Sequence, residues 1–262
     1  MSKVFLVTGV SRGIGSSIVE KLCSIETTKI VIGIARSKDK LEELKTQYSG
    51  KFDYICGDVS DEETITEAVN FIESKYKRLD GIVANAGVLD PVEDVNNIHI
   101  SKWKQLFDIN FFSVVSLVGH ALPLLKQSNG NIVLVSSGAS TKSYVMWKIY
   151  DQYGWGAYGA SKAALNHFAA TIAAEEPAVK AISVAPGVVK TKMQEDIRET
   201  FGPSGMTKEA LQRFVDLHDN DQLLPPSVPG TIYANLASKG IPSELDGAYL
   251  RYNDEKLRSF SE

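Results

Sequence analysis

The stretch Thr8-Gly9-Val10-Ser11-Arg12-Gly13-Ile14-Gly15 indicates the fold of this chain, because it joins the apolar run Val4–Val7 to a stretch of helical character. Glycines let a backbone turn tightly and approach a phosphate, and a helix N-terminus offers free N–H groups and a positive dipole end. The G-x-x-x-G-x-G spacing differs from the common G-x-G-x-x-G fingerprint, so its place between strand and helix carries the argument. A tight turn without a ligand is the alternative. The predicted cofactor-binding residues of this turn are Gly9, Ser11, Arg12, Gly13, Ile14 and Gly15.

Short apolar runs alternate with amphipathic stretches along the rest of the chain. The runs are Val4–Val7, Ile30–Ile34, Phe52–Cys56, Ile82–Ala84, Ile132–Val135, Ile182–Ala185 and Ala248–Leu250. They are rich in Val and Ile and show no inside/outside alternation, which is typical of strands buried on both faces of a parallel sheet. The sequence therefore predicts an α/β, Rossmann-type, doubly wound parallel sheet of about seven strands, with helices on both faces.

The amphipathic stretches predict the helices. Ser60 and Glu63 have the spacing of a capping box that opens a helix over 62–76, and Ser101 is a candidate cap for a long helix reaching Leu124. An Ala-rich helix is expected over 156–176, before Pro177. No repeat or linker interrupts the chain, so residues 1–262 are expected to form one domain. The least regular segment, 190–229, is expected to be an irregular substrate lid.

Composition excludes several classes of protein. Of the 262 residues, 44% are apolar and 23% are charged, the ordinary mix of a soluble globular protein. A formal net charge of −4 argues against nucleic-acid binding. No apolar run approaches a membrane span of about 20 residues, and no targeting segment is visible. Two cysteines cannot form a disulfide framework, and the four histidines lack metal-ligand spacing. We expect a cytoplasmic protein without metal, membrane or nucleic-acid partners.

The end of the second predicted strand bears on the choice of cofactor. An NAD site places an acidic residue there to bind the ribose 2′-hydroxyl. This chain instead has Ala35-Arg36-Ser37-Lys38. The guanidinium of Arg36 suits a 2′-phosphate, and Arg12 could approach the same phosphate from the glycine-rich turn. Two solvated loop arginines are the alternative, but the pattern favours NADP(H).

Two further strand ends fit the same ligand. Asp58 and Val59 follow the third strand, where an adenine edge would lie, although Asp58 could equally cap the next helix. Asn85-Ala86-Gly87 ends the fourth strand, and small residues there let the backbone pass close to the cofactor.

Candidate reaction chemistry follows the fifth strand. Ser137 lies at its end, where open α/β sheets bind ligands. Tyr158 and Lys162 stand at i and i+4, on one face of the Ala-rich helix. A nearby ammonium is expected to lower the pKa of the phenol and prepare Tyr158 to exchange a proton with a carbonyl oxygen held by Ser137. The polar Asn110, inside an apolar helix, is expected to support a proton relay that reaches Lys162.

A second Tyr-x-x-x-Lys copy spans 144–148. We reject it as catalytic because its middle residues are bulky and would keep a helix away from a cofactor. Tyr144, Trp147 and Trp155 are expected either to form a pocket wall or simply to pack a surface loop.

These ordered motifs together resemble the short-chain dehydrogenase/reductase family along nearly the whole chain. The resemblance implies a nicotinamide cofactor and a catalytic tetrad of Asn110, Ser137, Tyr158 and Lys162. It also implies that Tyr158, Lys162 and the segment Pro186-Gly187-Val188-Val189-Lys190-Thr191 contact the cofactor. Val189 and Thr191 would hold the carboxamide, and Lys162 the ribose. Family members are often homodimers or homotetramers.

More narrowly, the segments 82–89, 110–118 and 249–254 are similar to benzil reductases that form (S)-benzoin, which are near sepiapterin reductases. This implies an NADPH-dependent carbonyl reductase acting on a small ketone, with a diketone such as benzil preferred. A sepiapterin-type pteridine reductase and a non-catalytic NADPH-sensing protein are the alternatives. The link from Ser137 to Tyr158 is longer than the family usually has, and its extra stretch 145–153 is expected to border the pocket.

Overall fold

Seven parallel strands form one sheet in the order β3-β2-β1-β4-β5-β6-β7. The structure, a computed structural model, describes residues 2–141 and 153–262. The strands are β1 (Lys3–Thr8), β2 (Thr28–Ala35), β3 (Phe52–Cys56), β4 (Gly81–Ala84), β5 (Asn131–Val135), β6 (Lys180–Ala185) and β7 (Tyr249–Arg251). Every predicted apolar run coincides with one of them. The predicted doubly wound α/β sheet is confirmed.

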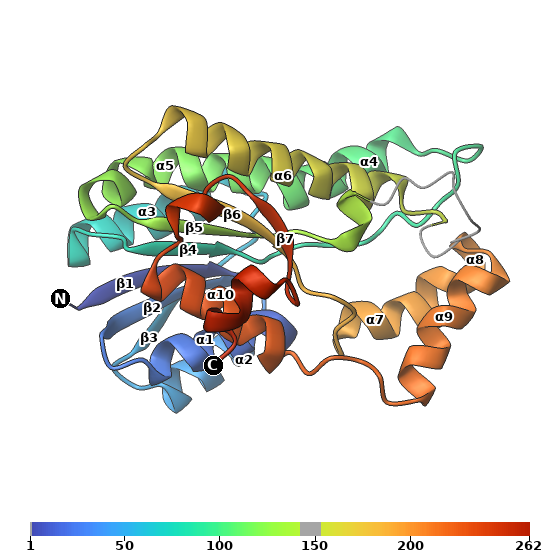
Figure 1. Cartoon of the computed structure of the whole chain (residues 1–262), viewed down its shortest axis with the longest axis horizontal. Coiled ribbons are helices and arrows are strands. Elements are labelled where there is room, and N and C mark those ends of the chain that lie inside the picture. The colour runs from blue at the N-terminus through green and yellow to red at the C-terminus, as the bar shows by residue number, and fades with distance from the viewer. Residues whose placement is uncertain (1, 142–152) are drawn as a thin grey trace.

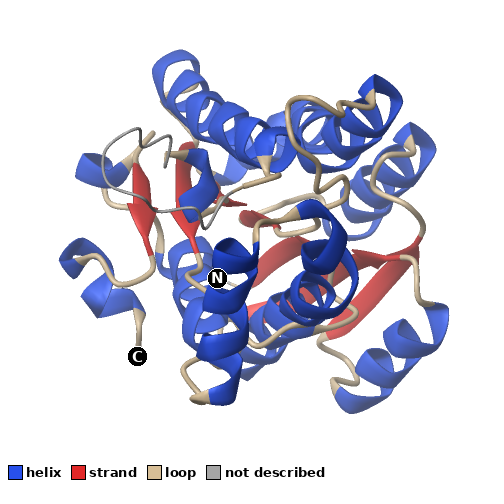
Figure 2. Cartoon of the chain, turned by 90° about the vertical axis from the view of Figure 1, so that its right-hand side faces the viewer, coloured by secondary structure: helices blue, strands red, loops and turns tan. Residues whose placement is uncertain are grey.

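Helices cover both faces of the sheet (Figures 1 and 2). On one face lie α3 (Glu62–Tyr76), α5 (Ser113–Ser128) and α6 (Gly156–Glu175). The other face packs against α1 (Gly13–Ser24) and α10 (Ser227–Lys239), with α2 (Lys38–Gln47) at the edge near β3. Three short 3-10 helices lie next to strands. They are η2 (Gly138–Ser140) after β5, η4 (Ser243–Leu245) before β7 and η5 (Glu255–Phe260) after β7.

The strand β1 shows why the apolar runs lack alternation. Val4 and Leu6 belong to the core beneath α3, α5 and α6, whereas Phe5 and Val7 belong to the core beneath α1 and α10. All four are fully buried, and burial of each such side chain stabilises the fold by roughly 1.5–3 kcal/mol. Helices cover both faces of the sheet, so a polar side chain on either face would be buried away from water. Both faces therefore require apolar residues, and the strands show no alternation.

The sheet order creates the place for a ligand. From β1 the chain builds β2 and β3 outward on one side and then returns to place β4 on the other side of β1. In open α/β sheets, ligands bind outside the carboxyl ends of the strands at such a switch point. The turns after β1 and β4 therefore flank the expected crevice.

Two predicted helix caps are wrong by one or two residues, although α3 spans the predicted range 62–76. Asp61, not Ser60, caps α3, and its side chain accepts from Glu63 N at 3.1 Å. The long helix begins as α4 (Ile100–Phe107), so His99 takes the cap position expected at Ser101. His99 N is instead bound by Glu93 Oε1 at 2.9 Å, a partner six residues away that local spacing does not reveal.

The helical run 100–128 continues from α4 through a π-helical turn, η1 (Asp108–Phe112), into α5. Among the described residues, this run is the one helix long and apolar enough in composition to cross a membrane, contrary to the sequence expectation. Leu117, Val118 and Leu125 in it are buried in the core against the sheet. Packing against the sheet therefore accounts for these buried apolar residues, which belong to the 44% of the run's most apolar window that is buried.

The segment 190–229 is helical rather than irregular, which corrects the sequence prediction. It contains α7 (Lys192–Asp196), the π-helical turn η3 (Ile197–Phe201), α8 (Gly202–Gly205), α9 (Lys208–Asp219) and the start of α10. Met193, Ile197 and Phe201 recur every fourth residue and pack with Tyr158 in a third apolar cluster. Pro203 occupies the first turn of α8, where a missing N–H costs little. Helices α7, α8 and α9 lie beyond the carboxyl ends of the strands (Figure 1).

Candidate active site

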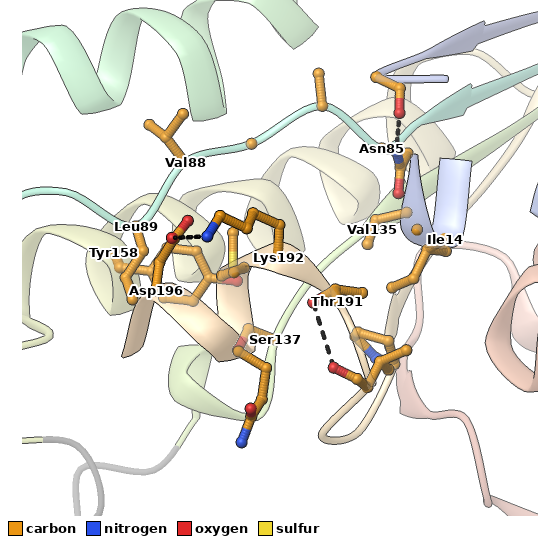
Figure 3. Close-up of a pocket in the computed structure, with 18 of the residues that line it drawn as sticks. Ile14, Asn85, Val88, Leu89, Val135, Ser137, Tyr158, Thr191, Lys192 and Asp196 are labelled. Atoms are coloured by element: carbon orange, nitrogen blue, oxygen red, sulfur yellow. Dashed lines mark hydrogen bonds and ion pairs between the residues drawn. The ribbon is translucent and has the colours of Figure 1, made fainter. Parts of the chain in front are cut away.

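A pocket of about 450 Å³ opens at the carboxyl ends of the strands. Most of the predicted site residues line it. They are Gly9, Ser11, Arg12, Gly13, Ile14, Arg36, Asp58, Val59, Asn85, Ala86, Gly87, Ser137, Tyr158, Lys162, Pro186, Gly187, Val189 and Thr191. In Figure 3, Tyr158 and Leu89 lie toward one end of the pocket and Ile14 toward the other. The structure therefore brings the predicted cofactor and reaction residues to one cavity.

The glycine-rich turn is held tightly against the end of β4. Thr8 Oγ1 accepts from Asn85 N and Ala86 N, both at 3.0 Å, and the Asn85 amide donates to the carbonyls of Thr8 and Gly9. A Cβ on Gly9, whose φ is +71°, would lie 2.9 Å from Ala86 Cα. A side chain at this position would force the two turns apart.

The first turn of α1 faces the pocket through Gly13 and Ile14. Among the described residues no side chain caps its N–H groups, and no acidic residue lies in that turn. The positive end of α1 is thus open to an anionic ligand and fits a pyrophosphate. Gly15, predicted to bind the cofactor, does not line the pocket. Its Cα packs against Gly9, so that a Cβ would overlap the Gly9 carbonyl oxygen.

Arg36 projects from the end of β2 beside Asp58. Its side chain is 67% exposed, and its Nη1 lies 3.4 Å from Asp58 Oδ2. Asp58 Oδ1 also accepts from Ser60 N and Ser60 Oγ. Although partial burial acts to raise it, the pKa of Asp58 is held below its ordinary value by these hydrogen bonds and by the charge of Arg36. Asp58 therefore orders its own turn and does not cap α3.

Tyr158, Lys162 and Ser137 meet where α6 crosses the end of β5. Ser137 and Tyr158 both line the pocket, and the Ser137 side chain lies near enough to the Tyr158 hydroxyl to act to lower its pKa. Lys162 Nζ lies 5.8 Å from the Tyr158 ring centroid and donates to the Val135 carbonyl at 2.8 Å. Gly159 permits this approach, because a Cβ there would lie 3.0 Å from the Ala139 carbonyl oxygen. The i, i+4 pair predicted from sequence faces the pocket.

The charge states of the pair differ from the expectation. Burial raises the pKa of the Tyr158 hydroxyl above its ordinary value, and the hydrogen bond with Ser137 only partly offsets this. Burial also lowers the pKa of the Lys162 ammonium to about 8. Both shifts favour the uncharged form, as expected for groups removed from water. The protein's own groups therefore leave Tyr158 a neutral phenol at neutral pH.

Asn110 lies behind the pocket and does not line it. It is fully buried in the π-helical turn, where Oδ1 accepts from Val88 N and Nδ2 donates to the Val88 carbonyl, each at 2.8 Å. Nδ2 also lies 3.3 Å from Ser161 Oγ. A Cβ placed on Gly87 would lie within 3.4 Å of both Asn110 Oδ1 and Lys162 Nζ. Asn110 thus fixes the segment after β4, in which Gly87 lies between Asn110 and Lys162.

The segment after β6 forms the opposite wall. Gly187 has a φ of +82°, and a Cβ there would overlap the Tyr252 ring. Val188 and Lys190 exchange main-chain hydrogen bonds with Leu224, which fixes this segment before α7. Thr191 Oγ1 donates to the Val189 carbonyl at 3.2 Å. The turn that the resemblance assigns to the cofactor is therefore rigidly placed at the pocket.

The pocket beyond Tyr158 is largely apolar. Trp155 stands edge-on to Tyr158, with ring centroids 5.9 Å apart, and lies 5.4 Å from Phe214. Its indole N–H is buried without a partner among the described residues. Met193, Ile197 and Phe201 add to this wall, whereas Tyr144 and Trp147 lie outside the described residues.

Sequence reasoning missed several polar lining residues. They are Lys192, Gln194, Asp196, Arg213 and Arg251. Arg251 is the last residue of β7. It could have been predicted, because ligands bind at the carboxyl ends of the strands in open α/β sheets. The remaining four lie on α7 and α9, which were expected to be irregular.

Comparison with known proteins identifies the family. The family model for short chain dehydrogenases matches residues 3–202. The chain is a short-chain dehydrogenase/reductase. It is 52% identical over 266 residues to a benzil reductase of Saccharomyces cerevisiae that forms (S)-benzoin, with 98% of each chain covered.

Solved structures agree with this assignment. A short-chain dehydrogenase/reductase of Saccharomyces cerevisiae superposes with a TM-score of 0.94 at 52% identity, covering all of both chains. A cytoplasmic protein of the same yeast gives a TM-score of 0.83 at 51% identity, again covering both chains fully. The protein is thus an oxidoreductase that interconverts carbonyl and alcohol groups with a nicotinamide cofactor.

Proposed function

We propose that this protein is an NADPH-dependent carbonyl reductase that reduces a ketone, with an aromatic diketone such as benzil as its preferred substrate class. The observation that carries this proposal is that the buried Tyr158, Ser137 and Lys162 line one pocket, with Lys162 Nζ 5.8 Å from the Tyr158 ring centroid. When bound, the nicotinamide supplies the hydride that the side chains lack.

The roles follow from the position of each group. Ser137 would hold the substrate oxygen by a hydrogen bond while Tyr158 donates its proton to that oxygen. Lys162, an ammonium at neutral pH, would bind the cofactor ribose and feed the relay that restores the Tyr158 proton. Asn110 would act indirectly, since both its amide groups are used on Val88 and Ser161.

The preference for NADPH rests on charge at the end of β2. Arg36 and Arg12 both line the adenosine side of the pocket, and no acidic residue ends β2. Asp58 contacts Arg36 from the next strand end, and both residues line the pocket. Such a guanidinium suits a 2′-phosphate better than a 2′-hydroxyl.

The diketone proposal rests on the apolar wall and on the similarity to the yeast benzil reductase. Trp155 and Phe214 would pack against an aryl group. The buried indole N–H of Trp155 would be matched by a second carbonyl oxygen, since an unpaired buried donor costs free energy. Residues 190–229 would act as the substrate lid of a single NADP-binding domain formed by residues 1–262.

The test compares purified Tyr158→Phe with wild type, using benzil and NADPH consumption at 340 nm. Phe keeps the ring packing and removes the proton donor, so reduction should fall by more than about 100-fold, in line with the usual contribution of general acid catalysis. Tyr153→Phe is the matched control, because Tyr153 is exposed and bonds only Asp94 among described residues. Unimpaired reduction by Tyr158→Phe would overturn the mechanism.

Two alternatives give different results in the same assay. A pteridine reductase would turn over sepiapterin faster than benzil. A non-catalytic NADPH-sensing protein would bind NADPH without consuming it over a broad carbonyl panel. The protonated Tyr158 and Lys162 pair speaks against the second, since binding alone does not require a proton donor.

We further propose a cytoplasmic homodimer or homotetramer that associates through α5 and α6. Phe112 is 55% exposed at the start of this surface, and its ring lies 5.3 Å from that of Phe111. Sedimentation of the purified protein would show a monomer if this surface is not an interface.

A further inference from the structure

A directed chain of hydrogen bonds connects α6 to the loop that carries Ser137. Ser136 Oγ donates to Asn166 Oδ1 at 2.6 Å, and Asn166 Nδ2 donates to Ser140 Oγ at 2.8 Å. Ser140 Oγ then donates to the Ser137 carbonyl at 2.6 Å. The chain begins at the end of β5, crosses to α6 and returns to the main chain of Ser137.

We propose that Asn166 is a positioning residue for carbonyl reduction, which sets the Ser137 hydroxyl against Tyr158 by fixing the loop 136–140 to helix α6. This inference rests on the proposed function, because it assigns Asn166 a role only through Ser137. Asn166 itself does not line the pocket.

The geometry of α6 makes this link informative. Tyr158, Lys162 and Asn166 follow each other at intervals of four residues, so one helix carries the proton donor, the ammonium and the clamp. Any movement of the Ser137 loop relative to α6 changes the distance from Ser137 Oγ to the Tyr158 hydroxyl. A misplacement of about 1 Å in such a pair can cost about 100-fold in rate.

Among the described residues, the loop 136–140 has other anchors. Ser136 N donates to the Val184 carbonyl at 3.0 Å, and Ser136 Oγ lies 3.5 Å from the Lys162 carbonyl. The Ser137 carbonyl accepts from Ser140 N and from the Tyr249 hydroxyl, each at 3.1 Å, and the Ser137 hydroxyl oxygen accepts from Ala139 N at 3.1 Å. The bonds from Ser140 and Ala139 lie within the loop itself. The loop is thus connected to other elements through Val184, Lys162, Tyr249 and Asn166. Of these, Asn166 is the residue on the helix of Tyr158 whose side chain bonds both Ser136 and Ser140.

The direction of the chain requires an amide at position 166. Its oxygen must accept from Ser136 while its nitrogen donates to Ser140, and only an amide of this length does both. A carboxylate has no donor, so Ser140 would turn its hydroxyl to the carboxylate and release the Ser137 carbonyl. Asn166→Asp therefore reverses one bond with almost no change in shape, and Asn166→Ala removes the link.

The experiment measures benzil reduction by Asn166→Ala and Asn166→Asp, with His167→Ala as the control on the exposed face of the same helix. We expect kcat to fall about tenfold in both Asn166 variants, while the KM for NADPH and the melting temperature stay close to those of His167→Ala. In alcohol oxidation, the pH at half-maximal kcat/KM should move upward in Asn166→Ala, because the Ser137 bond that lowers the pKa of Tyr158 is weakened. Unchanged kcat and pH profile would overturn the inference.

A double-mutant cycle separates positioning from general destabilisation. In a Ser137→Ala background, Asn166→Ala should reduce kcat by less than twofold further, because its effect passes through Ser137. A further tenfold loss would overturn the inference. If Ser137→Ala reduces activity strongly but Asn166→Ala does not, this inference alone fails. If Ser137→Ala leaves activity intact, the proposed function fails with it.

Discussion

Replacing Lys162 by Met tests the central electrostatic feature of the site without any substrate. Met keeps much of the length and apolar character of the lysine stem and removes the ammonium. Lys162 is 3% exposed, and burial lowers its pKa from an ordinary 10.5 to about 8. The folded protein therefore disfavours the charged form that the unfolded chain readily adopts, and stability must depend on pH through this group.

The sign follows from proton counting. Between pH 8 and 10.5 the unfolded chain holds more of the Lys162 proton than the folded protein does, so stability rises with pH in this window. Because a tenfold change in an equilibrium corresponds to about 1.4 kcal/mol, the contribution of Lys162 should increase by roughly 2.5 kcal/mol between pH 7 and 10. Below pH 8 the full cost of burying the ammonium is present.

The assay is urea unfolding of wild type and Lys162→Met at pH 7 and pH 10. The difference in unfolding free energy should move in favour of wild type by the stated amount at the higher pH. Lys192→Met is the control, because Lys192 donates hydrogen bonds to Glu195 and Asp196, which raise its pKa above 10.5. Its contribution to stability is lost only above that pH, so this variant should show little change between pH 7 and 10. If the difference in unfolding free energy between wild type and Lys162→Met is the same at pH 7 and pH 10, the pKa of Lys162 is not lowered by burial and the reasoning is refuted.

Three further variants test other parts of the site. Arg36→Ala should raise the KM for NADPH about tenfold and leave that for NADH within twofold in steady-state kinetics, since a charge-assisted bond at an exposed position contributes about 1.5 kcal/mol. Asn110→Leu should lower the unfolding free energy in urea by about 2 kcal/mol, because it leaves both main-chain groups of Val88 without their partner. Trp155→Phe keeps the ring contacts and removes the indole N–H, so kcat/KM should fall several-fold for benzil and less than twofold for acetophenone.

The sheet could be predicted from sequence because each strand is buried on two faces. Runs such as Ile30–Ile34 and Ile132–Val135 are continuously apolar, so they stand out from the amphipathic helices between them. Strands that alternate with helices along a chain pair in parallel. The glycine-rich turn could also be predicted from sequence, because Gly9 and Gly13 have positive φ values that other residues rarely adopt. Local sequence dictated these features directly.

Features set by distant partners could not be predicted. The cap position of α4 depends on Glu93, and the function of Asn110 depends on Val88, neither of which follows from periodicity. The segment 190–229 was expected to be irregular because its glycines and prolines suggested breaks. Its helices form because Met193 and Phe214 pack in a third cluster with residues far away in sequence.

The pKa of Tyr158 was expected to fall because of Lys162, and the reason it does not fall bears on the direction of catalysis. Burial acts on both groups, so the phenol retains its proton and the amine with a pKa of about 8 is still mostly protonated at pH 7. With Tyr158 and Lys162 both protonated, the site is suited to protonate the substrate oxygen during reduction of a ketone. Alcohol oxidation needs the phenolate, which this environment disfavours until the pH is raised. The protein's own groups therefore keep Tyr158 in the protonated form that carbonyl reduction uses near neutral pH, and the rate of oxidation should rise as the pH is raised.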